Sequence, residues 1–321
     1  MKRENVKVLT IFCSLIIVGL AFAANASAQC SRETLQKLAD TYVQAQTTGK
    51  ATMLPLAANA SYAENDQTMD IAKGVLAGAL KVDFTRSFHD TKQCATFTEL
   101  VAATDPHPYV IHTRMMATND GKVSKMESVV TDAGDWVFGA TEHLAVTRTE
   151  KWDVIPMDKR DTREAIQAAA DAYLNNWGDP TLPVPHGTPC SRLEGRTSTA
   201  ARNPEGQACT MGAFPQKLNV TNRRYIIDET IGAVDIFHNF PWLDAGIPTD
   251  PGTPASQMFR VEGGKNRYIH EVTVCTTANC GRGGGGPRGG QRGPGAPGAP
   301  GAPGAPGAPG APGAPGGQRG Q

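Results

Sequence analysis

The sequence has no excess of charge of either sign, because 31 lysine and arginine residues balance 31 aspartate and glutamate residues. Overall charge therefore provides no general attraction to nucleic acid or to an anionic membrane surface. Beyond one apolar run at residues 8–23, no stretch approaches the roughly 20 apolar residues that a membrane-spanning helix needs. We therefore expect a mature chain with no nucleic-acid partner and no membrane span.

The familiar motifs of hydrolases and nucleotide-binding proteins are also missing. The chain contains no Gly-x-Ser-x-Gly and no His-Glu-x-x-His. The pairs Gly121-Lys122 and Gly264-Lys265 lack the glycine five residues earlier that a phosphate-binding loop requires. We expect no cofactor.

The first 28 residues have the order of a cleavable secretory signal. Lys2, Arg3 and Lys7 precede the apolar run, and Ala26-Ser27-Ala28 follows it. We expect a secreted or periplasmic protein.

Six cysteines remain once Cys13 has left with the signal. An even number in an exported chain favours disulfides. No Cys-x-x-Cys pair is present, so we expect no metal site. The distribution of the cysteines along the chain predicts the pairs Cys30 with Cys94, Cys190 with Cys209, and Cys275 with Cys280.

The same order of segments occurs twice along the chain. The first occurrence consists of a helical pattern ending near Tyr42, the segment Tyr62-Ala-Glu64-Asn65 and the segment 120–127. The second consists, in the same order, of a helical pattern through Tyr173, the segment Arg192-Leu-Glu194-Gly195 and the segment 263–270. Repetition of this kind predicts two related modules. The expected parts are a signal at 1–28, a first module at 29–133, a packed connector at 134–161, a second module at 162–280 and a low-complexity tail at 281–321.

Each module begins with a helical pattern and continues with strand patterns. Leu35, Leu38, Tyr42 and Ala45 have helical spacing before Gly49, and Asp161-Thr-Arg-Glu164 is a capping-box pattern. A further helix is predicted at about 70–80. Strands are predicted at 109–116, 122–131, 223–228, 233–240, 257–262 and 266–275. A helix followed by a meandering sheet is typical of an α+β fold.

Residues 295–315 of the tail are seven Gly-Ala-Pro triplets. Glycine at every third position permits a collagen triple helix, which would make the tail a short trimerisation segment. The alternative is an extended polyproline-type spacer on a monomer.

Several of these segments resemble a known family. Tyr62-Ala-Glu64-Asn65, and Asp120-Gly121-Lys122-Val123 leading to Glu127, are similar to the nuclear-transport-factor-2-like cone fold, the group that includes SnoaL-like polyketide cyclases. Trp152-Asp-Val-Ile-Pro156 and Asn222-Arg223-Arg224-Tyr225 resemble an uncharacterised family of secreted fungal and bacterial proteins with such a domain. The resemblance implies a curved sheet around a helix, with a pocket at its open end. Single-domain members often dimerise through the outer sheet face, so a tandem chain is expected to form this contact internally, as a monomer with a pseudo-dimer inside it.

Two histidines of the second module are the candidate acid/base residues. His270 alternates with Tyr268, Val272 and Val274, and His238 alternates with Val234, Ile236 and Phe240. We expect both histidines to face one apolar cavity, where a nearby carboxylate can poise a histidine as an acid or base. The candidate carboxylates are Asp228, Glu194 and Glu262.

A ligand in this cavity would need groups that hold an oxygen atom. Arg223, Arg224 or Arg260 could bind a carboxylate or enolate oxygen, and Tyr225 or Tyr268 could donate a hydrogen bond. The alternative is that all these polar residues form an internal network of ion pairs and hydrogen bonds that holds the sheet.

The first module is interpreted as scaffold. Glu127 aligns with His270 and Glu64 with Glu194, so the two glutamates are secondary candidates for proton transfer. His112 and Arg114 lie on the face opposite Ile111, which we expect to be solvated.

These patterns predict an exported protein that binds a small organic ligand in its second module. A cofactor-free acid/base reaction of the isomerase, dehydratase or lyase type would fit such a site. The alternative is a non-catalytic binding or cell-surface interaction module.

Overall fold

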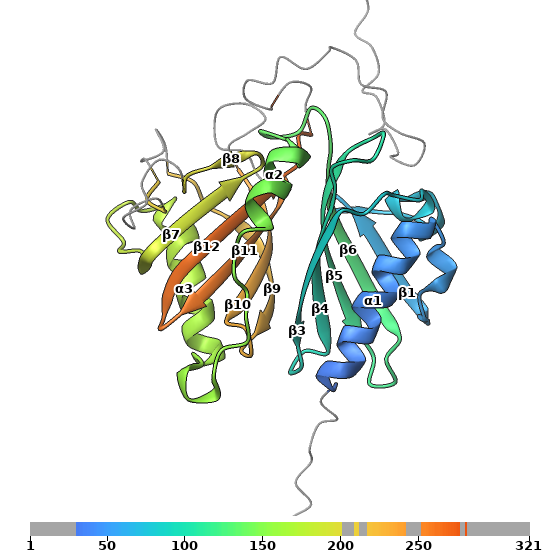
Figure 1. Ribbon diagram of the computed structural model, residues 1–321, viewed down its shortest axis with the longest axis horizontal. Coiled ribbons are helices and arrows are strands. Elements are labelled where there is room, and N and C mark those ends of the chain that lie inside the picture. The colour runs from blue at the N-terminus through green and yellow to red at the C-terminus, as the bar shows by residue number, and fades with distance from the viewer. Residues whose placement is uncertain (1–29, 201–208, 212–216, 242–251, 277–279, 281–321) are drawn as a thin grey trace, which may run out of the picture.

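The computed structural model describes residues 30–200, 209–211, 217–241, 252–276 and 280. The predicted signal and the Gly-Ala-Pro tail lie outside these residues. The fold is α+β, with two six-stranded sheets (Figure 1). In the described part of the chain, no helix is long and apolar enough to cross a membrane.

The first module begins with helix α1 (Arg32–Thr48). Ser31 caps its N-terminus by accepting a hydrogen bond from the Thr34 amide, and Gly49 ends it in the left-handed conformation that glycine adopts without steric cost. Leu35, Leu38, Tyr42 and Ala45 are buried as their spacing predicts.

Six strands form the first sheet in the order β2-β1-β6-β5-β4-β3. Strand β1 pairs parallel with β6, and the remaining pairs are antiparallel. The strands are β1 (Leu56–Glu64), β2 (Gln67–Thr68), β3 (Phe84–Asp90), β4 (Ala95–Ala102), β5 (Tyr109–Ala117) and β6 (Val123–Thr131).

The helix predicted at 70–80 is wrong. This segment contains two single turns of 3₁₀ helix, η2 (Ile71–Lys73) and η3 (Val75–Ala77), and a third turn, η1 (Ala51–Met53), follows α1. Gly74 and Gly78 are extended and end the two turns before an α-helix can propagate.

The second module repeats the first. Helix α3 (Arg163–Asn176) is followed by a sheet in the order β8-β7-β12-β11-β10-β9, in which β7 pairs parallel with β12. Matching order and matching parallel pairing confirm the internal repeat. The strands are β7 (His186–Glu194), β8 (Thr197–Ser198), β9 (Thr221–Asp228), β10 (Ala233–Phe240), β11 (Thr253–Glu262) and β12 (Lys265–Thr273).

The two sheets pack face to face, with α1 and α3 on their outer sides (Figure 1). Phe88, Phe97, Phe237 and Met258 are buried in the apolar layer between the sheets, which we call the inter-sheet layer. Both faces of each sheet are therefore covered.

Matched contacts relate the modules as in a two-fold dimer. Asp90, at the end of β3, binds Arg163, the first residue of α3, at 2.6 Å. Asp228, at the end of β9, binds Arg32, the first residue of α1, at 2.7 Å. Each carboxylate also accepts a backbone amide of the opposite module. Reciprocal contacts between equivalent residues are characteristic of a two-fold interface.

The connector contains a helix that the sequence patterns did not predict, α2 (Ala140–Thr147), and one 3₁₀ turn, η4 (Met157–Lys159). His143 and Leu144 of α2 are buried. The Ile155 amide donates to the carbonyl of Thr230 in the second module. The connector therefore packs against both modules.

The three predicted disulfides are confirmed. Cys30–Cys94 ties the start of α1 to the first sheet, and Cys190–Cys209 ties β7 to the segment that follows it.

Candidate functional site

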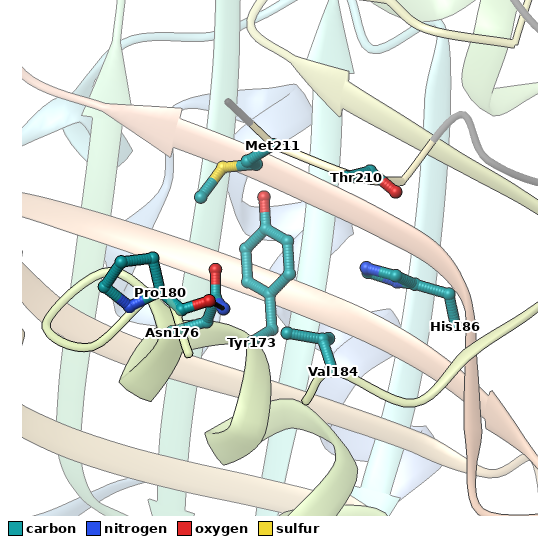
Figure 2. A pocket seen from close by; sticks show the side chains of 7 residues that line it. All are labelled: Tyr173, Asn176, Pro180, Val184, His186, Thr210 and Met211. Carbon is teal, nitrogen blue, oxygen red and sulfur yellow. Dashed lines mark hydrogen bonds between the residues drawn. The ribbon is translucent and has the colours of Figure 1, made fainter. Parts of the chain in front are cut away.

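A cavity of about 340 Å³ lies beside the C-terminal half of α3, and we call it the α3 cavity. A volume of this size suits a small organic molecule. Figure 2 shows the Tyr173 ring in the middle, with Pro180 and Asn176 on one side and His186 on the other. The lining residues are Tyr173, Asn176, Pro180, Val184, His186, Thr210 and Met211.

Local contacts hold the lining in place. Tyr173 lies on the buried face of α3, and its ring meets the Phe259 ring edge-on at 5.6 Å between centroids. The Asn176 amide donates to the carbonyls of Pro180 and Leu182, at 3.3 and 2.9 Å, and so shapes the turn after the helix. The apolar wall and the turn are thus ordered without a ligand.

Hydrogen-bond donors converge behind the Tyr173 ring. Arg192 Nη1 donates to the Tyr173 hydroxyl at 3.1 Å. Within the described residues, Arg192 Nε and His186 Nδ1 are buried atoms with no hydrogen-bond partner. Burial lowers the pKa of His186, with a further contribution from Arg192, and burial raises the pKa of Tyr173. A neutral imidazole, a neutral phenol and a guanidinium N–H can together hold an oxygen acceptor.

A pair of carboxyl groups lies on the neighbouring strands. Glu194 of β7 and Glu271 of β12 are partners in the parallel ladder. Glu271 accepts hydrogen bonds from Gln257 and Thr273, both at 2.8 Å. Burial, together with the charge of Glu194, raises the pKa of Glu271 to about 8.

The equivalent region of the first module is filled by protein. The Tyr42 hydroxyl is 2.9 Å from Thr113 Oγ1, and the Tyr62 hydroxyl donates to Glu64, which also accepts the Val75 amide. The Val75 turn follows Gly74, where a Cβ would lie only 2.6 Å from the Tyr62 ring. A ligand would have to displace this packed segment.

The prediction that His270 and His238 face one cavity is wrong. His238 lies on the α3 side of its sheet, with its ring 6.2 Å from that of Trp177. His270 points to the opposite side, where its neighbour in alternation, Val272, packs in the inter-sheet layer. Burial lowers the pKa of His238 to about 3, so its ring is neutral at neutral pH. The face of β12 that carries His270 and Val272 therefore packs against the first module.

Asp228 is not the partner of His270. Its carboxylate binds Arg32 and accepts the amides of His89 and Thr230. Because Arg32 and His89 belong to the first module, Asp228 lies in the interface between the modules and not in the α3 cavity.

The predicted ligand-binding arginines are engaged with acids or carbonyls of the protein. Arg223 binds Asp171 of α3 at 2.8 Å, and Tyr225 donates to the same carboxylate at 2.8 Å. Arg224 reaches across the interface to Asp66 at 2.7 Å. These contacts fit the internal-network alternative.

Arg260 and Tyr268 also lie outside the α3 cavity. Arg260 binds Glu262 at 2.9 Å and donates to the carbonyl of Asp153 in the connector. The Tyr268 ring is 5.8 Å from that of Trp152. Glu194 is not among the residues that line the cavity either, and it accepts a hydrogen bond from Trp136 at 2.8 Å.

The polar face of the first sheet is buried, so the prediction that His112 and Arg114 are solvated is wrong. His112 is fully buried and Arg114 is 6% exposed. Glu127 binds Arg114 and Lys125, as well as Arg224 of the second module. His112 and Arg114 face the second module, which covers this side of the sheet.

Two groups of side chains in the described residues have the composition of a metal site. His186 lies near Cys190 and Cys209, but the two sulfurs form a disulfide and have no thiolate to offer. Glu99, His143 and His270 form the second group, which is fully buried between the sheets. Sequence reasoning missed Glu99 and His143 because they come from distant segments with no common motif.

It also missed His186, which lines the cavity, Arg192, which donates to the Tyr173 hydroxyl, and Glu271 on the same side of the sheet. Alternation places Glu271 on the same face as Ile269, which packs against α3. This alternation can be read from the sequence, but Val272 and Val274 make the opposite face of β12 more apolar, so the prediction took that face as the inner one.

One family model matches part of the chain. Residues 159–273 match the model of a domain of unknown function, DUF8021. This range includes α3, the second sheet and all seven residues that line the α3 cavity. No curated protein matches the chain.

Proposed function

We propose that this chain is an exported protein whose second module binds a small organic ligand in the α3 cavity. Each module would be a cone of the nuclear-transport-factor-2-like type, and the internal pseudo-dimer would take the place of a second copy. One observation carries the proposal. His186 Nδ1, in the cavity lining, and Arg192 Nε, whose guanidinium donates to the lining residue Tyr173, are buried nitrogens with no hydrogen-bond partner among the described residues.

The lining indicates the chemistry of the ligand. Val184, Pro180 and Met211 offer apolar contact, and the Tyr173 ring offers an aromatic edge and a hydroxyl. Arg192 Nε can only donate a hydrogen bond. A compact, largely apolar molecule with a carboxylate, phenolate or carbonyl oxygen satisfies these groups.

A second candidate function is cofactor-free acid/base catalysis of the isomerase, dehydratase or lyase type. It is favoured by the adjacent carboxyl groups of Glu194 and Glu271, one of which can hold a proton while the other is ionised. In this version Glu271 takes the role that the sequence patterns assigned to His270.

A thermal-shift screen tests the binding proposal. The chain is screened against panels of aromatic, polyketide-like and sugar-acid compounds. A ligand at 100 times its Kd adds about 2.7 kcal/mol of apparent stability. Hits are then measured with Tyr173→Phe and Arg192→Gln, and Tyr42→Phe of the first module is the matched control.

Binding in the α3 cavity predicts that Arg192→Gln weakens a hit by at least tenfold while Tyr42→Phe leaves the Kd unchanged. Equal Kd values for all three variants would place the ligand elsewhere. The absence of any hit across broad panels would favour a surface-interaction module. If a hit is also turned over, Glu271→Gln should abolish turnover and preserve binding.

A further inference from the structure

Three histidine nitrogens surround a single carboxylate oxygen between the two modules. Glu99 Oε1 is 2.9 Å from His143 Nε2, 3.4 Å from His270 Nδ1 and 4.0 Å from His112 Nε2. All four side chains are fully buried. We call these residues the Glu99 cluster. They come from β4, α2, β12 and β5, so the cluster joins the first module, the connector and the second module.

An oxygen atom lies within 2.9 Å of the outer nitrogen of each ring. His143 Nδ1 is 2.9 Å from the Gly195 carbonyl, His112 Nδ1 is 2.7 Å from Ser256 Oγ, and His270 Nε2 is 2.7 Å from Glu150 Oε2. Metal-binding histidines almost always have such a partner, which fixes the ring and turns the other nitrogen toward the metal.

His112 gives the clearest indication that something is needed inside the cluster. Ser256 donates its only hydroxyl hydrogen to Asp235 at 2.6 Å, so it accepts from His112 Nδ1. The inner nitrogen of a neutral His112 is then a lone pair, and it has no hydrogen-bond partner. It faces the Glu99 oxygen, which is also an acceptor. A cation between them would pair with both acceptors.

The other two rings also turn one nitrogen toward the same oxygen. His143 lies between Glu99 and the Gly195 carbonyl, and His270 lies between Glu99 and Glu150. Arg86 binds the other Glu99 oxygen at 3.1 Å. One divalent cation among the inner nitrogens and Glu99 Oε1 would serve all three rings and supply a partner for His112.

We propose that Glu99 Oε1, His112 Nε2, His143 Nε2 and His270 Nδ1 bind one divalent cation of the zinc class. Imidazole nitrogens with one carboxylate oxygen are a typical zinc donor set. Ligand atoms around a tetrahedral zinc ion lie roughly 3.3 Å apart. Those of Glu99, His143 and His270 already lie within 4.8 Å of one another, whereas His112 Nε2, 4.0 Å from Glu99 Oε1, has to move closer to complete the site. Four protein ligands leave no open position, so the ion is structural.

The surroundings suit a structural ion. The His112 ring packs against Phe97 with centroids 5.1 Å apart, and the His270 ring is 6.2 Å from that of Trp152. An apolar shell excludes water and strengthens the bonds to the ion. The ion would fasten the connector helix and both sheets together, independently of any ligand in the α3 cavity.

Metal content tests the proposal. The full chain, with its disulfides intact, is unfolded in guanidinium chloride with a chelator and refolded with excess Zn²⁺ or Co²⁺. Bound metal is then measured by mass spectrometry after gel filtration. We expect one ion per chain, the visible absorption of tetrahedral Co²⁺, and a higher Tm than for protein refolded without metal.

Variants locate the ion. His143→Gln and His270→Gln should each lower bound metal at least tenfold, and Glu150→Gln, which removes an orienting contact, should weaken metal affinity by roughly 10- to 100-fold. His107→Gln is the matched control, because this half-exposed histidine also binds a carboxylate, that of Asp132. It should bind metal as the wild type does.

Refolded wild-type protein that holds no metal would overturn the proposal and identify the cluster as a buried ion network. So would folded His143→Gln and His270→Gln variants that keep a full equivalent of metal. The wild-type measurement decides the question even if a variant fails to fold.

Discussion

Replacing Asp228 by alanine should destabilise the junction of the two modules without emptying the α3 cavity. The Asp228 side chain is 1% exposed and accepts hydrogen bonds from Arg32, from the His89 amide and from the Thr230 amide. The Arg32 side chain is 32% exposed, so water can solvate it once its partner is gone.

The expected loss follows from these partners. Breaking an ion pair with a partly exposed arginine costs up to about 1 kcal/mol. Leaving the buried His89 amide without an acceptor costs roughly 1–3 kcal/mol more, whereas the part-buried Thr230 amide can reach water. We expect Asp228→Ala to lower the free energy of unfolding by about 1–4 kcal/mol, and Arg32→Gln by about 1 kcal/mol or less.

Urea unfolding followed by tryptophan fluorescence measures both variants, and the double variant completes a mutant cycle. Asp90→Ala, which breaks the equivalent contact to Arg163, should give a loss of similar size. The reasoning is refuted if Asp228→Ala unfolds within about 0.5 kcal/mol of the wild type. Loss of cavity ligand at unchanged stability would instead restore Asp228 as a site residue.

Three further predictions concern stability. Phe237→Ala, which empties a buried position in the inter-sheet layer, should cost about 3–5 kcal/mol in urea unfolding, and a loss below 1 kcal/mol would contradict the face-to-face packing. Burial lowers the pKa of His89 to about 4 and that of His238 to about 3, so each contributes stability that is lost as the pH falls from about 6.5 toward 4, against the opposite contribution of Glu271, whose pKa is raised to about 8. The Tm of His238→Gln relative to that of the wild type, measured against pH, isolates the contribution of His238 and should rise as the pH falls. Cys30 and Cys94 close a loop with a sequence separation of 64, so replacing both with alanine should cost ~4 kcal/mol by loop entropy, with an unchanged unfolding free energy as the contrary result.

Local features were predictable because neighbouring residues decide them. Gly49 marked the end of the first helix and the capping box at 161–164 marked the start of the second, and the structure has α1 and α3 there. The hairpin between β5 and β6 follows from the turn sequence at 119–121. The α-helix predicted at residues 70–80 was wrong because the prediction used the apolar spacing alone, although Gly74 and Gly78 interrupt the segment.

The sequence by itself determined the repeat, the end of α1, the start of α3, the hairpins β5–β6 and β11–β12 and the cysteine pairs, because these depend on short-range patterns or on distribution along the chain. Only the tertiary structure decided which face of each strand meets which partner. Alternation separates the two faces of β12, but when a second sheet covers the outer face, both faces are buried and polarity no longer marks the inside. This is why His270 belongs to the Glu99 cluster and Glu271 to the region of the α3 cavity, although they are adjacent in the chain.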